Sequence, residues 1–166
     1  MNAHSTQILE PHRITEAKLF LQTTIPAATS KLLATKKPHW GKMTPQHMIE
    51  HLYTAVIGST IIKKTPPIPP NSNQEAFKNA LIYSLEPMGR NLDNPAFRFG
   101  LPDYTNASLV EAKSKLLSSL ERFFEVYQGK EDAYNFNPFL GDLHAQETLI
   151  FHYKHFKHHY TQFGLI

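Results

Sequence analysis

Apolar residues recur every three or four positions along four long stretches of the chain, the spacing that places side chains on one face of a helix. The four stretches are residues 15–34, 45–62, 109–128 and 144–163. Pro26 interrupts the first stretch, and because proline cannot donate to the helix ladder, this helix should be kinked or broken. A shorter pattern over residues 74–85 predicts a minor helix. No convincing strand pattern is present, so we expect an all-α protein.

The predicted helices begin at residues whose side chains suit the first turn. Thr44 is a natural cap, and Pro45 fits the first helical position because its missing N–H costs nothing there. Ser108 begins the sequence pattern of a capping box for the third long helix. His144 is a weaker cap for the last helix, and Asp142 is the alternative.

The connections between these helices differ in length. Residues 135–141 predict a turn before the last helix. Residues 63–73 contain four prolines and predict an extended connector, and residues 86–104 predict irregular structure. The whole connection over residues 63–104 is too long for a minimal hairpin loop. It suits a bundle in which one connection crosses over between the second and third long helices.

Four of the ten histidines fall within an eight-residue stretch of the last predicted helix, at positions 152, 155, 158 and 159. Helical geometry places His155 and His159 about 40° apart at the border of the apolar stripe, and His158 opposite the centre of that stripe. Imidazoles four residues apart can bind one metal ion. His152, one turn earlier, is a candidate to support a ligand by a hydrogen bond, and the alternative is a buried core histidine.

A pair of histidines rarely suffices for a tight metal site, so a third ligand elsewhere would decide between a site and a surface pair. In the second predicted helix, His51 borders the apolar stripe that contains Met48 and Leu52. His47 lies one turn earlier and about 40° further from that stripe, so it should be solvated.

Composition and charge narrow the class of protein. The chain has 166 residues, of which 41% are hydrophobic, and we expect one domain over residues 15–166 after a flexible N-terminal segment, residues 1–14. The net charge is +3, but the basic residues are scattered, so we expect no nucleic-acid surface. The absence of cysteine excludes disulfides and thiolate metal sites. No apolar stretch reaches the roughly 18 residues of a membrane helix and no secretory signal is evident, so we expect a cytoplasmic protein without membrane contact.

Three blocks of the sequence together resemble an uncharacterised branch of the DinB/YfiT-like metalloprotein superfamily. The blocks are Trp40-Gly41-Lys42-Met43-Thr44-Pro45-Gln46 with His51-Leu52, then Asn137-Pro138-Phe139 with Gly141, and finally His155, His158-His159 and Gln162-Phe163-Gly164. The resemblance covers about residues 15–166, and its end blocks are specific in residue type and order. It implies an up-down-down-up four-helix bundle with a long crossover connection between the second and third helices.

The resemblance also implies a metal site. Its histidine positions correspond to His51, His155 and His159, and Gln162 matches the glutamine that follows the last ligand. Two positions depart from the superfamily pattern. His144 stands where relatives often have threonine, which weakens the start of the last helix. Thr161 stands where the wider superfamily usually has glycine, so packing near the site should differ.

Three neutral imidazoles would leave a coordination position open on a divalent metal ion, as in catalytic sites. Zn and Ni are the metals we expect first, with Fe, Mn and Co as further candidates. The resemblance implies a metal-dependent hydrolase or thiol S-transferase with a small-molecule substrate. A non-catalytic metal-binding or stress-response module, or a bundle with structural histidines, are the alternatives. The sequence leaves open which metal and substrate bind and whether the chain forms a homodimer.

Overall fold

The computed structural model describes residues 8–90 and 97–166. Its first helical rod consists of α1 (Pro11–Leu19), a π-helical turn η1 (Phe20–Thr24) and α2 (Ile25–Lys31). The π turn ends two residues before Pro26, which has no N–H to donate to the helix ladder. The predicted interruption is therefore a widened turn rather than a break. The rod begins at Pro11, four residues before the predicted start. Residues 1–7 of the expected flexible segment lie outside the described residues.

The other three predicted long helices are confirmed as α3 (Pro45–Ser59), α5 (Leu109–Tyr127) and α6 (Ala145–Gln162). The Thr44 hydroxyl accepts a hydrogen bond from the His47 backbone N–H at 3.3 Å. At the start of α6, the His144 backbone N–H donates to Glu147 at 3.1 Å. The prediction of Asp142 as the alternative cap is wrong, because its carboxylate binds Lys63 and the backbone N–H of Ile68.

A β-hairpin that the sequence did not predict precedes α6. Strands β1 (Tyr134–Asn137) and β2 (Gly141–His144) pair antiparallel, with Tyr134 opposite His144 and Asn137 opposite Gly141. The turn expected over residues 135–141 is therefore confined to residues 138–140, between the strands. Ile62 makes a further bridge to Asn135, so the start of the long connection is tied to β1.

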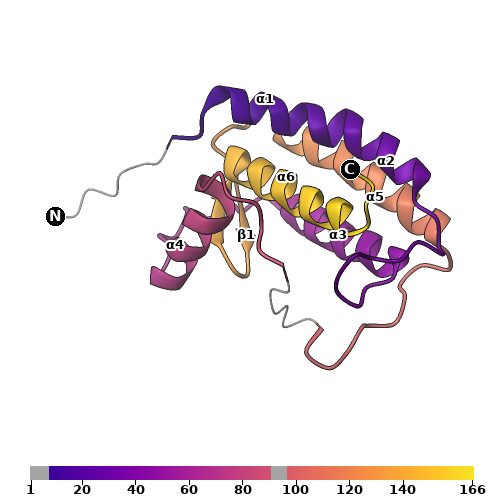
Figure 1. Ribbon diagram of the computed structural model, residues 1–166. Helices are drawn as coiled ribbons and strands as arrows, with labels where there is room; N and C mark the ends of the chain where they lie inside the picture. Colours follow the sequence, from indigo (N-terminus) through magenta and orange to yellow (C-terminus); the bar gives the residue numbers. More distant parts are fainter. Residues whose placement is uncertain (1–7, 91–96) are drawn as a thin grey trace.

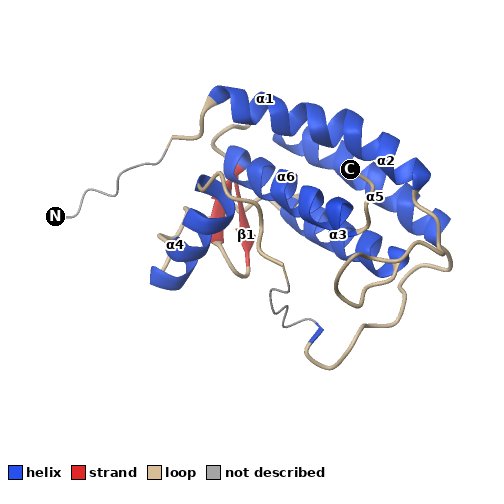
Figure 2. Cartoon of the chain, in the orientation of Figure 1, coloured by secondary structure: helices blue, strands red, loops and turns tan. Residues whose placement is uncertain are grey.

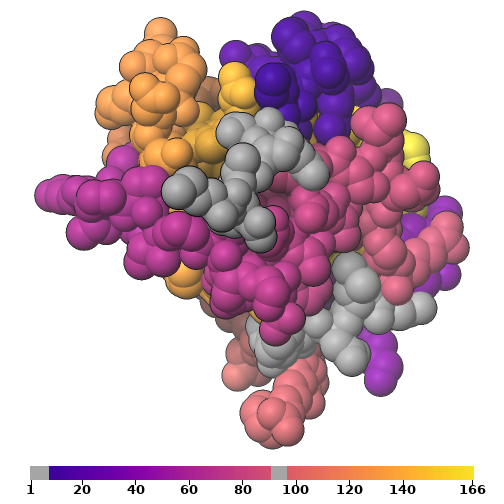
Figure 3. Space-filling model, turned by 90° about the vertical axis from the view of Figure 1, so that its left-hand side faces the viewer, coloured from indigo at the N-terminus to yellow at the C-terminus, as the bar shows by residue number. Residues whose placement is uncertain are grey.

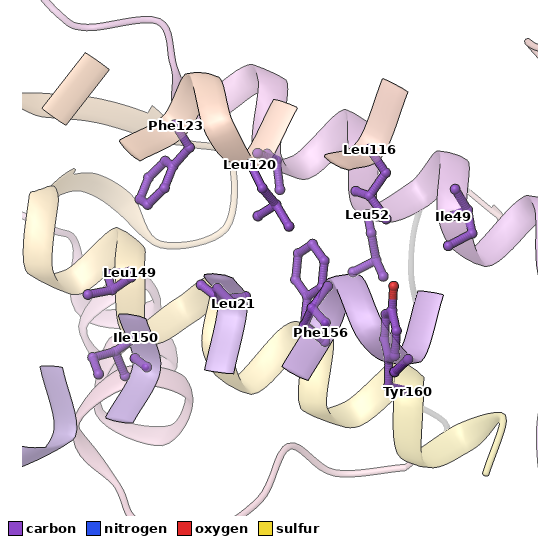
Figure 4. Packing of buried hydrophobic residues seen from close by; sticks show 14 of the residues in the cluster. Leu21, Ile49, Leu52, Leu116, Leu120, Phe123, Leu149, Ile150, Phe156 and Tyr160 are labelled. Atoms are coloured by element: carbon purple, nitrogen blue, oxygen red, sulfur yellow. The ribbon is translucent and has the colours of Figure 1, made fainter. Parts of the chain in front are cut away.

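The long helices lie side by side in Figures 1 and 2. The α1–α2 rod and α6 run in one direction along the molecule, and α3 and α5 run in the other. α3 packs against α5 and α6, and α1 packs against α6. The side chains of Leu52, Leu116 and Phe156 meet in the space between α3, α5 and α6 (Figure 4). The protein is thus mostly helical, with its core between these helices.

The long connection between α3 and α5 contains α4 (Ser72–Lys78) and a π turn η2 (Asn79–Tyr83). Figure 3 shows this part of the chain spread over one end of the molecule, beside the hairpin. The Lys154 ammonium and the Arg13 guanidinium both donate to the carbonyl oxygen of Ser84, and so hold the end of η2 against the long helices. Among the described residues, no helix combines the length and apolar character that crossing a membrane requires.

Candidate metal centre

The packing of α3 against α6 brings three histidines together. His51 lies on α3, and His155 and His159 lie one turn apart on α6. One ring nitrogen from each of the three lies within 4.8 Å of the others. The Nε2 atoms of His51 and His155 are 2.8 Å apart, so one ring donates to the other and a metal ion bound by both would take the place of that shared proton. These are the three ligand positions expected from the sequence.

Burial keeps the three imidazoles uncharged. It lowers the pKa of His51 to about 4, with a further contribution from the nearby His158. Burial and the proximity of His51 lower the pKa of His159 to about 3, although the hydrogen bond to Gln162 opposes this. Burial and the neighbouring histidines hold the pKa of His155 well below its usual value. The neutral ring is the form that binds metal, so at neutral pH binding requires no net loss of a proton from these rings. The hydrogen between the Nε2 atoms of His51 and His155 must only move to another ring nitrogen.

Gln162 and His152, the two residues expected to support a metal ligand, differ in their hydrogen-bond partners. Gln162 contacts a proposed ligand, because its Oε1 lies 2.8 Å from Nδ1 of His159. His152 is fully buried, and its Nε2 lies 2.8 Å from the Ser59 hydroxyl. Its ring packs edge-on against Phe123, at a centroid distance of 5.1 Å. Within the described residues, no hydrogen bond joins His152 to the three clustered histidines.

The neighbouring histidines, His47 and His158, have partners of their own. The ring of His47 bonds to the Thr44 hydroxyl at 2.9 Å and to the carbonyl oxygen of Pro102 at 2.9 Å. His158 lies edge-on to Trp40, and its Nδ1 is 3.3 Å from the carbonyl oxygen of Met88. Both are partly buried, so the expectation of a solvated His47 is only partly met. The helical positions nevertheless separated His51 from His47, and the α6 pair from His158.

Two aromatic rings that the sequence reasoning did not single out contact the cluster. Phe97 lies 5.6 Å from the ring of His51, and Phe151 lies 5.3 Å from the ring of His155, between centroids. Phe151 stands one helical turn before His155, so its position could have been inferred from the sequence. Phe97 belongs to an irregular segment, where no periodicity indicates which side chains face inward.

The acidic residues nearest in sequence to the cluster are bound elsewhere. Burial alone would raise the pKa of Glu50, but hydrogen bonds from the Thr105 backbone, Gln46 and Asn106 outweigh it and lower the pKa to about 2. Glu147 accepts hydrogen bonds from Lys78 and Tyr83, near the start of α6. In the described part of the chain, the cluster of possible metal ligands therefore consists of histidines alone.

Comparison with protein-family models, with curated proteins and with solved structures found no match to this chain. The three neutral imidazoles on two packed helices fit a divalent metal ion by their chemistry and their mutual distances.

Proposed function

We propose that this protein binds one divalent metal ion through His51, His155 and His159. The observation that carries the proposal is that one ring nitrogen from each residue lies within 4.8 Å of the others, although His51 is 104 residues from His155. Zn and Ni are the metals that we propose first, because imidazole suits both. Three protein ligands would leave a coordination position for a water molecule or a group of the substrate. A bound metal would lower the pKa of the water or group that occupies it.

We further propose that the chain is a DinB/YfiT-like four-helix bundle. Support comes from the shared direction of the α1–α2 rod and α6, the opposite direction of α3 and α5, and the long connection between α3 and α5. One possible ligand on the second long helix and two on the last, four residues apart, are also what the sequence resemblance implies.

Of the two candidate reactions, we propose thiol transfer in preference to hydrolysis. Zinc hydrolases of the HExxH type pair the metal with a glutamate as general base. Here Glu50 and Glu147 are occupied by hydrogen bonds from other residues. In thiol transfer, a metal-bound thiol would release its proton to solvent, because a coordinated thiol is deprotonated. The thiolate sulfur would then bond to the electrophilic carbon while the leaving group departs from that carbon, so no protein carboxylate is required. Among the described residues, the same lack of an available carboxylate beside the cluster supports the alternative of a non-catalytic metal-binding module.

Metal content in protein without a histidine tag tests the proposal. After dialysis against Zn or Ni and removal of excess metal, wild type should retain about one ion per chain by elemental analysis. The His51→Ala/His155→Ala/His159→Ala variant should retain almost none. Equal metal content in both proteins would overturn the proposed site.

Turnover assays then separate the two functions. Wild-type protein loaded with Zn or Ni is assayed for transfer of small thiols to an electrophile and for ester hydrolysis. The His155→Ala variant is the control. A metal-dependent rate that His155→Ala loses would support an enzyme, whereas fully loaded but inert protein would favour the binding module.

A further inference from the structure

The turn before α3 lies against the C-terminal end of α6, beside the proposed metal ligands. The Gln162 side-chain amide donates from Nε2 to the carbonyl oxygen of Trp40 at 2.8 Å, and its Oε1 lies 2.8 Å from Nδ1 of His159. The backbone is joined at the same place, because the His39 N–H donates to the carbonyl oxygen of Gln162 at 2.7 Å. A chain of two hydrogen bonds thus leads from the Trp40 backbone to His159.

This chain of hydrogen bonds fixes where the proton of His159 resides. A backbone carbonyl oxygen can only accept, so the NH2 group of Gln162 must face Trp40 and Oε1 must face His159. Because Oε1 can also only accept, Nδ1 of His159 must carry the hydrogen. A neutral imidazole carries one ring hydrogen, so Nε2 keeps its lone pair.

The backbone at Gly41 allows this close contact. Gly41 has φ of 79°, in the left-handed region, and a Cβ atom there would lie 2.6 Å from Nε2 of Gln162. Gly164, just after α6, has φ of 59°, and a Cβ atom there would lie 2.8 Å from the ring of His39. Both sides of the contact between the turn and α6 are therefore too tight for a side chain at these glycines.

We propose that the Trp40–Gly41 turn is a positioning element for His159: through Gln162 it selects the tautomer whose Nε2 can bind the metal. This inference rests on the proposed metal site. Nδ1 of His155 is buried without a hydrogen-bond partner among the described residues, so of the two α6 histidines only His159 receives this support. Groups that orient metal-bound histidines in this way typically change metal affinity about 10–100-fold when removed.

The tautomer is measured in metal-free protein, which separates this inference from the proposed function. Long-range proton–nitrogen NMR spectra at neutral pH should show His159 of wild type as the Nδ1–H form, and Gln162→Met should give a mixture or the Nε2–H form. An Nε2–H ring in wild type, or no change in Gln162→Met, would overturn the inference even if zinc binds. If wild type showed the Nδ1–H form but bound no zinc, the proposed metal site and the metal-positioning role would fail together.

Zinc affinity, measured by competition with a chromophoric chelator, tests the positioning role. Gln162→Met and Gly41→Ala should each weaken binding about 10–100-fold. Gly58→Ala is the matched control, because Gly58 lies within α3 and an added Cβ meets no atom within 4 Å, so its affinity should equal that of wild type. Unchanged affinity in Gln162→Met overturns the role, and this variant decides the matter if Gly41→Ala does not fold.

Discussion

At the scale of single residues, four histidines are held uncharged by burial, and their neighbours distinguish them. His51, His155 and His159 face one another, and each has a nitrogen placed toward the other two. His152 instead bonds to the Ser59 hydroxyl and packs against Phe123. An imidazole that stays neutral in the folded chain resists protonation, so each of these residues makes the stability of the metal-free protein depend on pH.

His152 gives the clearest pH prediction, because burial alone lowers its pKa, to about 3. In the unfolded chain the pKa of this histidine is about 6.5. The contribution of neutral His152 to the free energy of unfolding is therefore complete above about pH 6.5 and is lost as the pH falls toward 3. In urea unfolding of metal-free protein between pH 6.5 and 4, one such group steepens the fall in stability by about 1.4 kcal/mol per pH unit. His152→Phe should show a shallower dependence by about that amount. An unchanged dependence would mean that His152 is not buried in its neutral form.

At the scale of the elements, periodicity and caps predicted the long helices, since apolar spacing and residues such as Thr44 report directly on helix faces and ends. The same helical geometry favoured His51 over His47 and the pair His155 and His159 over His158, and the family resemblance grouped the three as ligands. The hairpin was missed because its strands are four residues long, and β1 buries an asparagine where an apolar residue would signal a strand. The contact between Gln162 and the Trp40 carbonyl could not be predicted, because it depends on the path of a loop.

Asn135 explains how the hairpin is held. Its side-chain amide donates to the Tyr127 hydroxyl at 2.9 Å and to the Thr148 hydroxyl at 2.6 Å, and so joins β1 to α5 and α6. Asn135→Leu should lower the free energy of unfolding by about 1–3 kcal/mol in chemical denaturation, because buried polar partners lose their donor. Phe136→Leu is the control, because the Phe136 side chain is exposed, and it should change stability by less than about 0.5 kcal/mol. Equal effects would contradict the role given to the buried amide.

At the scale of the whole molecule, the proposed metal site lies where α3 and α6 pack together. Its two α6 residues belong to the C-terminal half of that helix, whereas the hairpin leads into the N-terminal end. His51 and His155 come from helices far apart in the sequence, so the three nitrogens converge only in the folded chain. A metal ion that binds there should therefore bind the folded state almost exclusively. At 100 times its dissociation constant, such a ligand stabilises the fold by about 2.7 kcal/mol, which for a domain of this size raises Tm by roughly 5–10 °C.

The metal-dependent shift in Tm tests the central claim most directly. Wild type, His47→Ala and His158→Ala should each show a rise of about 5–10 °C with Zn or Ni, reversed by a chelator. His51→Ala, His155→Ala and His159→Ala should lose most of that rise, because two imidazoles bind metal far more weakly than three. A rise in His155→Ala as large as in His158→Ala, or no rise in wild type with either metal, would contradict the three-histidine site.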